Sequence, residues 1–201
     1  MPAASLTEEQ LREAGIGSFF RPSQLERLGI SYDQLLGMVA VGIVQHVARG
    51  LYRLSAMEPT EQYSLAAACA RVPKSVVCLL SALGVHGLGT QLPNEVWLAI
   101  PHKARAPRPA GVRLRIVRFS GPAWNHGIVD TQFEGVPARI TSPARTIVDC
   151  FRFERLVGRE AAMEALRDAL QQKLVSRDAL LSIQEILPSV PLREAVNVLT
   201  S

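Results

Sequence analysis

The stretch RPSQLERLGISYDQLLGMVAVGIVQHVARGLYRL, residues 21–54, decides how the N-terminal part of the chain folds. Pro22 stands just inside the start of a helix, where its missing N–H costs nothing. Gly29 can adopt the left-handed conformation that ends that helix. Ser31 is placed to cap a second helix, because its side-chain oxygen can accept a hydrogen bond from the first turn. The stretch therefore predicts two short helices joined by a tight turn.

After Gly42 the spacing of apolar residues changes from helical to alternating, which indicates a strand. The turn at residues 48–50 and the return at residues 51–54 predict a short hairpin. A further helix over residues 6–14, capped by Thr7, precedes the stretch. The predicted buried face of the second helix consists of Leu35, Leu36, Val39 and Ile43. Three helices and a basic hairpin predict a winged helix-turn-helix over residues 1–56. Domains of this kind usually bind duplex DNA.

In such a domain the hairpin touches phosphates or the minor groove, where the planar, permanently charged Arg side chain is favoured. The start of the first helix of the pair is well placed to bind a phosphate. The second helix offers its exposed side to the bases. The candidate DNA contacts are Arg21, Ser23, Gln24, Ser31, Tyr32, Gln34, His46, Arg49 and Arg53.

The expected exposed side of the second helix contains no Arg or Lys. It offers Tyr32, Gln34, Gly37, Met38 and Val41. Gln34 can bind adenine through both ends of its amide, whereas Met38 and Val41 can touch thymine methyl groups. The alternative is that this side packs against another subunit or helix.

The ending VARGLYRL, residues 47–54, resembles the wing of the AbiEi family of antitoxin-type transcriptional regulators. Similar proteins commonly carry Arg or Lys on the exposed side of the second helix, and this chain departs from that pattern. Four further stretches agree with the family and together cover most of the chain: SLAAACARVPKSVVCLLSALGVHGL from Ser64, LPNEVWLAIP from Leu92, GVRLRIVRF from Gly111 and GVPARITSPARTIVDC from Gly135. The last of these is the most specific.

The resemblance implies the antitoxin of a type IV toxin–antitoxin system. Such a protein represses its own operon, binding inverted repeats as cooperating copies, and opposes a nucleotidyltransferase toxin without forming a stable complex with it. The domain of residues 61–201 would carry the neutralising activity or add DNA contacts. Two alternatives stay open: a stand-alone winged-helix regulator or architectural DNA-binding protein without a toxin partner, and an enzyme that uses the second domain.

The pattern of residues 61–201 predicts an α+β domain with a small, mostly antiparallel sheet flanked by helices. Glu134-Gly135 marks the turn of a hairpin between strands 128–133 and 136–140. Further strands are expected at 95–100 and 112–119. Helices are expected at 61–72, from Pro73 to about residue 83, from Ser142, at 159–174, at 176–187 and at 191–199.

The composition favours a cytoplasmic protein. A hydrophobic content of 48% excludes a mainly disordered chain. No segment reaches the ~18 apolar residues of a membrane span, and the N-terminus lacks the features of a secretion signal. Cys69, Cys78 and Cys150 have no metal-type spacing, so we expect buried thiols. We therefore expect neither a metal nor a cofactor, no catalytic residues and no membrane partner.

The basic surplus lies in the middle of the chain. Residues 101–155 hold ten bases and four acids, whereas residues 1–54 hold five of each. This stretch could extend the DNA footprint, bind RNA, meet an acidic partner, or remain solvated. Its candidate second basic surface consists of Lys103, Arg105, Arg108, Arg113, Arg115 and Arg118. Arg145 and Asp149, four residues apart in a predicted helix, are expected to form a structural ion pair.

Overall fold

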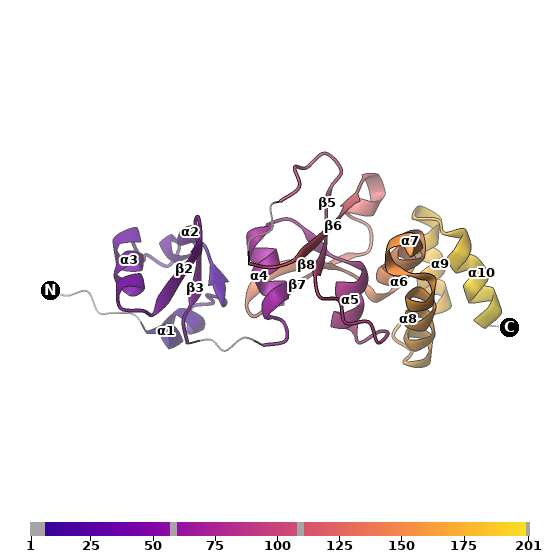
Figure 1. Ribbon diagram of the computed structural model, residues 1–201, viewed down its shortest axis with the longest axis horizontal. Coiled ribbons are helices and arrows are strands. Elements are labelled where there is room, and N and C mark those ends of the chain that lie inside the picture. The colour runs from indigo at the N-terminus through magenta and orange to yellow at the C-terminus, as the bar shows by residue number, and fades with distance from the viewer. Residues whose placement is uncertain (1–6, 57–59, 108–110, 200–201) are drawn as a thin grey trace. The chain divides into compact units, whose positions relative to one another are not determined.

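The computed structural model describes residues 7–56, 60–107 and 111–199 (Figure 1). Contacts divide the chain into two units: unit 1 is Met1–Pro73 with Gln132–Ala138, and unit 2 is Lys74–Thr131 with Arg139–Ser201. The division differs from the expected domains 1–56 and 61–201, because helix α4 (Tyr63–Arg71) belongs to unit 1. There the ring of Tyr63 lies 5.3 Å from that of Phe19.

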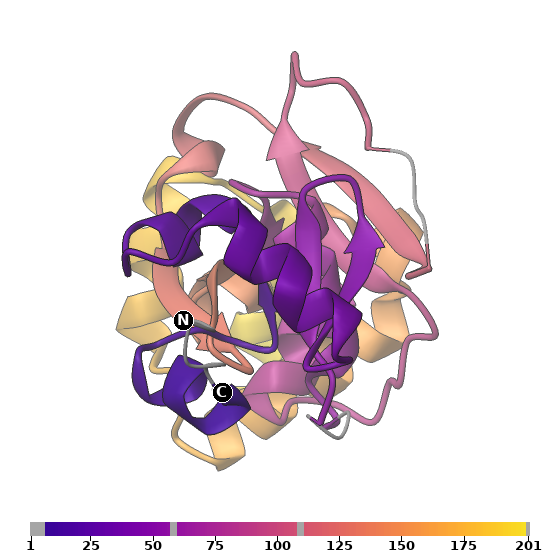
Figure 2. The same ribbon diagram turned by 90° about the vertical axis from the view of Figure 1, so that its left-hand side faces the viewer.

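Unit 1 places the helices α1 to α4 beside a small antiparallel sheet. Figure 2 shows the chain turned by 90° from the view of Figure 1. The strand order is β1-β3-β2. The core includes Leu11, Phe20, Leu25, Leu35, Val44 and Leu54. Before α4, the elements are α1 (Glu8–Glu13), β1 (Phe19–Phe20), α2 (Pro22–Glu26), α3 (Tyr32–Ala40), β2 (Val44–Ala48) and β3 (Leu51–Leu54).

The helix starts of unit 1 follow the sequence signals. Thr7 caps α1 and Ser31 caps α3, each accepting from the backbone N–H of the residue three positions later. Gly29 has a φ of 75°, the left-handed conformation expected between α2 and α3. These predictions are confirmed because caps and tight turns depend on neighbouring residues alone.

The predicted faces of α3 are partly wrong. Leu36 was expected in the core but is 46% exposed, whereas Met38 was expected outside but is only 5% exposed. The helix buries Leu35 and Met38, which lie three residues apart on one face. Leu36 points about 100° away from Leu35, since an α-helix has about 3.6 residues per turn. Val39 and Ile43 are half-buried against the core, as expected.

Unit 2 combines the larger sheet with a group of helices. The sheet order is β6-β5-β4-β8-β7. Its elements are β4 (Val76–Val77), α5 (Leu79–His86), β5 (Val96–Pro101), β6 (Leu114–Phe119), the 3-10 helix η1 (Gly121–Trp124), β7 (Ile128–Phe133), β8 (Val136–Thr141), α6 (Pro143–Arg152), α7 (Glu154–Val157), α8 (Arg159–Gln171), α9 (Arg177–Ile186) and α10 (Val190–Leu199); the tip of the β7–β8 hairpin belongs to unit 1.

The larger sheet is mixed, so the expectation of a mostly antiparallel sheet is wrong. Strand β4 pairs antiparallel with β5 but parallel with β8, and β5 pairs parallel with β6. Parallel neighbours need a connection of about a dozen residues or more, and the segment 102–113 joins β5 to β6. Val76 and Val77, expected in a helix, are fully buried strand residues. The chain is thus α+β, as predicted, but two pairs of neighbouring strands, β4 with β8 and β5 with β6, are parallel and not antiparallel.

Helix α6 occupies the centre of the helical group and contacts α5, α7, α8, α9 and α10. Its residues Ile147, Val148, Cys150 and Phe151 are almost completely buried. The helix begins as the sequence predicts, with Ser142 as cap and Pro143 in the first turn. Among the residues described, no helix combines the length and hydropathy needed to cross a membrane.

The turn of the β7–β8 hairpin forms hydrogen bonds with other residues of unit 1. Glu134 and Gly135 have φ values of 47° and 76°, as a two-residue hairpin turn of the primed type requires. The backbone N–H of Ser18 donates to the Glu134 carbonyl at 2.8 Å, and the hydroxyl of Thr60 donates to its carboxylate at 2.6 Å. Burial opposes ionisation of Glu134, but hydrogen bonds from Thr60 and Ser18 and the charge of Arg53 together outweigh it and lower the pKa of this carboxyl group.

The approach of Gly17 to Gly135 leaves no room for a side chain. A Cβ added at Gly17 would lie 2.5 Å from the Gly135 carbonyl carbon, which is backbone and cannot rotate away. Gly17→Ala should therefore lower the free energy of unfolding by ~1–3 kcal/mol, the usual cost of overpacking. Urea unfolding measures the effect. Gly37→Ala, in α3, where a Cβ meets nothing within 4 Å, is the matched control and should be neutral or stabilising. Equal loss in both variants would contradict the steric explanation.

Candidate nucleic-acid interface

The start of α3 meets the hairpin β2–β3 through a pair of tyrosines. The hydroxyl of Tyr32, the first residue of α3, lies 3.3 Å from the hydroxyl of Tyr52 in β3. The ring of His46, in β2, lies 5.0 Å from the Tyr52 ring. The hydrogen bond with Tyr32 and burial raise the pKa of Tyr52 above its usual value. Three elements of unit 1 thus converge on one surface.

Several predicted DNA contacts are exposed in unit 1. Arg49, in the turn between β2 and β3, and His46 are exposed, as are Ser23, Ser31 and Tyr32. Arg49 is the one charged residue in the turn at residues 48–50. An exposed guanidinium there is free to approach a phosphate without first giving up an internal partner.

The two glutamines among the predicted contacts serve as helix caps. The side-chain oxygen of Gln34 accepts from the Ser31 backbone N–H at 2.8 Å, and that of Gln24 accepts from Arg21 at 2.9 Å. A bidentate contact with adenine needs both the oxygen and the nitrogen of the amide. While its cap is formed, the Gln34 oxygen already accepts one hydrogen bond and the amide is held at the helix start, so a bidentate contact with adenine would compete with the cap.

Arg21 and Arg53 hold unit 1 together. The guanidinium of Arg21 donates to the Ala70 carbonyl at 3.0 Å and reaches the Gly50 carbonyl at 3.5 Å. It therefore ties the start of α2 to the hairpin turn and to the end of α4. The guanidinium of Arg53 lies 5.1 Å from the centre of the Tyr63 ring. Both side chains are half-buried, so a phosphate contact would compete with these internal ones.

The outer face of α3 is mainly apolar. Its exposed residues are Tyr32, Asp33, Leu36, Gly37 and Ala40. Val41, which ends the helix, is 68% exposed. Sequence reasoning missed Leu36 and Asp33 as surface candidates. Placing Leu35 and Met38 together on the buried side would have brought both residues to the outside.

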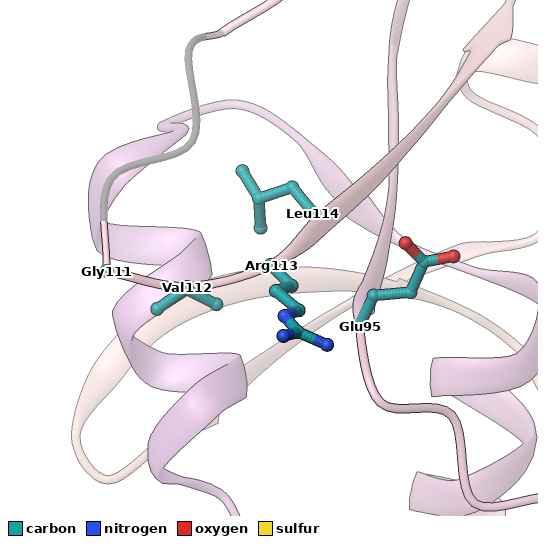
Figure 3. A pocket seen from close by; sticks show the side chains of 5 residues that line it. All are labelled: Glu95, Gly111, Val112, Arg113 and Leu114. Carbon is teal, nitrogen blue, oxygen red and sulfur yellow. The ribbon is translucent and has the colours of Figure 1, made fainter.

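Unit 2 carries the second basic surface on its edge strand. Arg113 and Arg115 are exposed on or beside β6, which lies at one end of the sheet order. The Arg115 guanidinium lies 5.5 Å from the centre of the Trp97 ring. Figure 3 shows Arg113 and Glu95 lining an open hollow together with Gly111, Val112 and Leu114. The hollow thus brings one carboxylate, that of Glu95, to the edge that carries Arg113.

The remaining predicted members of that surface differ in their roles. Arg118 donates to the carbonyls of His102 and Ala104 at 2.6 and 2.8 Å, so it fixes the segment after β5. Lys103 and Arg105 are exposed. Arg108 lies outside the described residues. Four bases of the predicted set are exposed and, unlike Arg118, are not seen to donate to backbone carbonyls among the described residues: Lys103, Arg105, Arg113 and Arg115.

Arg145 and Asp149 form the expected ion pair at the centre of unit 2. Both side chains are fully buried, and the Arg145 Nε lies 2.8 Å from the Asp149 carboxylate. The other Arg145 nitrogens donate to the carbonyls of His126 and Ala123. The guanidinium also lies 4.9 Å from the centre of the Phe119 ring. Every nitrogen of this buried cation has a partner, as a structural role requires.

The other reactive groups of the chain are also internal. The His86 ring nitrogen lies 2.7 Å from the Thr141 carbonyl, and burial lowers the pKa of this imidazole. Burial raises the pKa of Cys69 to about 12 and also raises the pKa values of Cys78 and Cys150. Protonated, buried thiols are poor nucleophiles. Within the described part of the chain, no group of three or more His, Cys, Asp or Glu residues is placed to hold a metal ion.

Comparison with known proteins shows the fold and nothing finer. No family model matches the chain, and no curated protein matches it. Among solved structures, it is similar to the crystal structure of the RV2827C protein from Mycobacterium tuberculosis, with a TM-score of 0.55 and 16% sequence identity. The match covers 97% of this chain and 71% of that one. The resemblance to AbiEi antitoxins stays a prediction.

Removing the buried cation should be far more costly than removing an exposed one. Arg145→Met leaves the carbonyls of His126 and Ala123 without their partner and leaves Asp149 only its ion pair with the partly exposed Arg152 at 3.2 Å. We therefore expect a loss of ~3–5 kcal/mol in the free energy of unfolding. Arg159→Met removes a mostly exposed ion pair with Glu154 at 3.6 Å and should cost less than about 1 kcal/mol. Chemical unfolding compares the two variants. A loss as small in Arg145→Met as in Arg159→Met would refute the structural role.

Proposed function

We propose that this chain is a DNA-binding transcriptional regulator and that unit 1 is its winged helix-turn-helix. The order α1, β1, α2, α3, β2, β3 and the antiparallel order β1-β3-β2 support this assignment. In such a domain α3 enters the major groove, while the hairpin β2–β3 is the wing that lies along the backbone. The observation that carries the proposal is the exposed Arg49 in the turn of that hairpin, which itself contacts the first residue of α3 through Tyr52.

The charge of residues 1–54, which contain the proposed winged domain, suggests that one copy binds weakly. Affinity for DNA of any sequence comes mainly from neutralised phosphates. Residues 1–54 carry five arginines and five acids, and Arg21 and Arg53 already have internal partners. Stable occupancy of a promoter therefore needs two copies on an inverted repeat, or added contacts from the exposed bases of unit 2. Two copies would place half-sites about one or two helical turns apart.

The resemblance to AbiEi antitoxins extends the proposal to a type IV toxin–antitoxin system. The protein would act in the cytoplasm, repress its own operon and oppose a nucleotidyltransferase toxin without forming a stable complex with it. The alternative is a regulator without a toxin partner. A nucleotidyltransferase gene beside the gene for this chain, whose toxicity this protein relieves on co-expression, would favour the antitoxin role.

Arg49→Ala tests the wing. We expect weaker binding, to about the same extent, for the protein's own promoter and for random duplex, because phosphate contacts carry no sequence information. The slope of log affinity against log salt should fall by about one unit for each phosphate that the variant no longer neutralises. Gel shifts at several salt concentrations measure both effects. Arg177→Ala, an exposed arginine in α9, is the control, and an Arg49→Ala slope equal to that of the parent would remove the wing from the interface.

Charge reversal tests the basic surface of unit 2. Arg113→Glu combined with Arg115→Glu should weaken promoter binding by about tenfold or more near physiological salt, if this strand follows the same duplex. Lys173→Glu combined with Arg177→Glu changes the net charge equally at two other exposed positions. Fluorescence anisotropy with labelled promoter DNA compares the two double variants. Equal affinities would show that net charge alone matters and that β6 does not touch DNA.

A further inference from the structure

The outer face of α3 has little capacity for hydrogen bonding. Leu36 and Ala40 lie four residues apart on this face, and both are exposed. The Gln34 oxygen is held by the Ser31 N–H, and the Tyr32 hydroxyl is paired with that of Tyr52. Within α3, which the structure describes in full, Asp33 is the one charged side chain. A ligand that covers this face must therefore offer apolar groups.

The major groove of DNA contains one apolar group, the C5 methyl of thymine. Apart from the small C5–H of cytosine, the other groups that distinguish the base pairs in this groove are hydrogen-bond donors or acceptors. If Leu36 covered such a polar edge, it would remove water from that edge and give nothing in return, which is unfavourable. Contact with a thymine methyl instead buries apolar surface on both sides.

Asp33 fits the same base pair. A carboxylate can accept a hydrogen bond from a base amino group, and the adenine opposite each thymine presents one in the major groove. Asp33 and Leu36 lie three residues apart, so their side chains are neighbours on the helix surface. The exposed arginines that precede and follow α3, Arg27 and Arg49, supply the opposite charge for flanking phosphates. This charge complementarity favours a duplex over a second copy of the chain as the occupant.

We infer that α3 selects A·T base pairs through the thymine methyl group, with Leu36 as the principal contact and Asp33 as a second contact on the partner adenine. The inference rests on the proposed function, because it requires α3 to enter the major groove. It replaces the amide of Gln34, whose oxygen serves the helix cap, as the source of base selection.

Duplexes that differ only in the methyl group provide the test. The promoter of this chain's own gene is amplified once with dTTP and once with dUTP, since deoxyuridine lacks only the C5 methyl. The full-length protein should bind the thymine duplex more tightly, by about three- to fivefold for each methyl contact. In Leu36→Ala the ratio of the two affinities should fall towards one. Leu181→Ala, an equally exposed leucine in α9, should leave both affinities unchanged.

The possible outcomes separate the inference from the proposed function. Failure of the parent protein to bind the thymine duplex would overturn the proposed function. Equal binding of both duplexes by the parent would overturn the methyl contact alone, and this comparison needs no variant to fold. An unchanged ratio in Leu36→Ala, with folding verified by circular dichroism, would place the contact elsewhere and overturn the role of Leu36. If sedimentation shows a dimer that Leu36→Ala converts to a monomer, a second copy covers this face and the inference is wrong.

Discussion

The burial of the Arg145 guanidinium is the constraint around which unit 2 is built. A cation with no access to water needs hydrogen-bond partners inside the protein, and Asp149, His126 and Ala123 supply one oxygen for each of its three nitrogens. The segment that follows η1 must therefore pass close to α6. Gly127 allows this approach, because a Cβ there would lie 2.8 Å from the Arg145 Cβ. Strand β7 begins at the next residue, so the ion pair also fixes the start of the β7–β8 hairpin.

In unit 1, several polar side chains of the predicted interface form hydrogen bonds within the unit. Gln24 and Gln34 cap helices, and Arg21 binds the carbonyls of Gly50 and Ala70. These contacts set the position of the hairpin turn relative to α2, which is a condition for presenting Arg49 in one place. The same contacts reduce the number of side chains left for a ligand. A site that presents few cations per copy gains most from acting in pairs, since each added copy brings its own cations to further phosphates.

The sequence predicts those features that depend on adjacent residues. Thr7, Ser31 and Ser142 cap helices, and Glu134-Gly135 forms the hairpin turn, because caps and turns are determined within a few positions. It does not predict the strand at Val76–Val77 or the parallel pairing of β5 with β6, since both depend on partners distant in sequence. The internal contacts of Arg21 could not be predicted for the same reason, as Ala70 is 49 residues away.

The face that α3 exposes could not be read from hydrophobicity, because apolar residues occur on two sides of the helix. Leu35 and Met38 satisfy the helical spacing of a core face, but Leu36 and Val39 satisfy it equally well. Packing on α2 and β2 selects the first pair and leaves Leu36 outside. A single exposed leucine on a helix surface would need no explanation. Here it stands with Ala40 and Val41 on the outer face of α3. In the proposed helix-turn-helix, the packing that buries Leu35 would therefore also determine which bases α3 can accept.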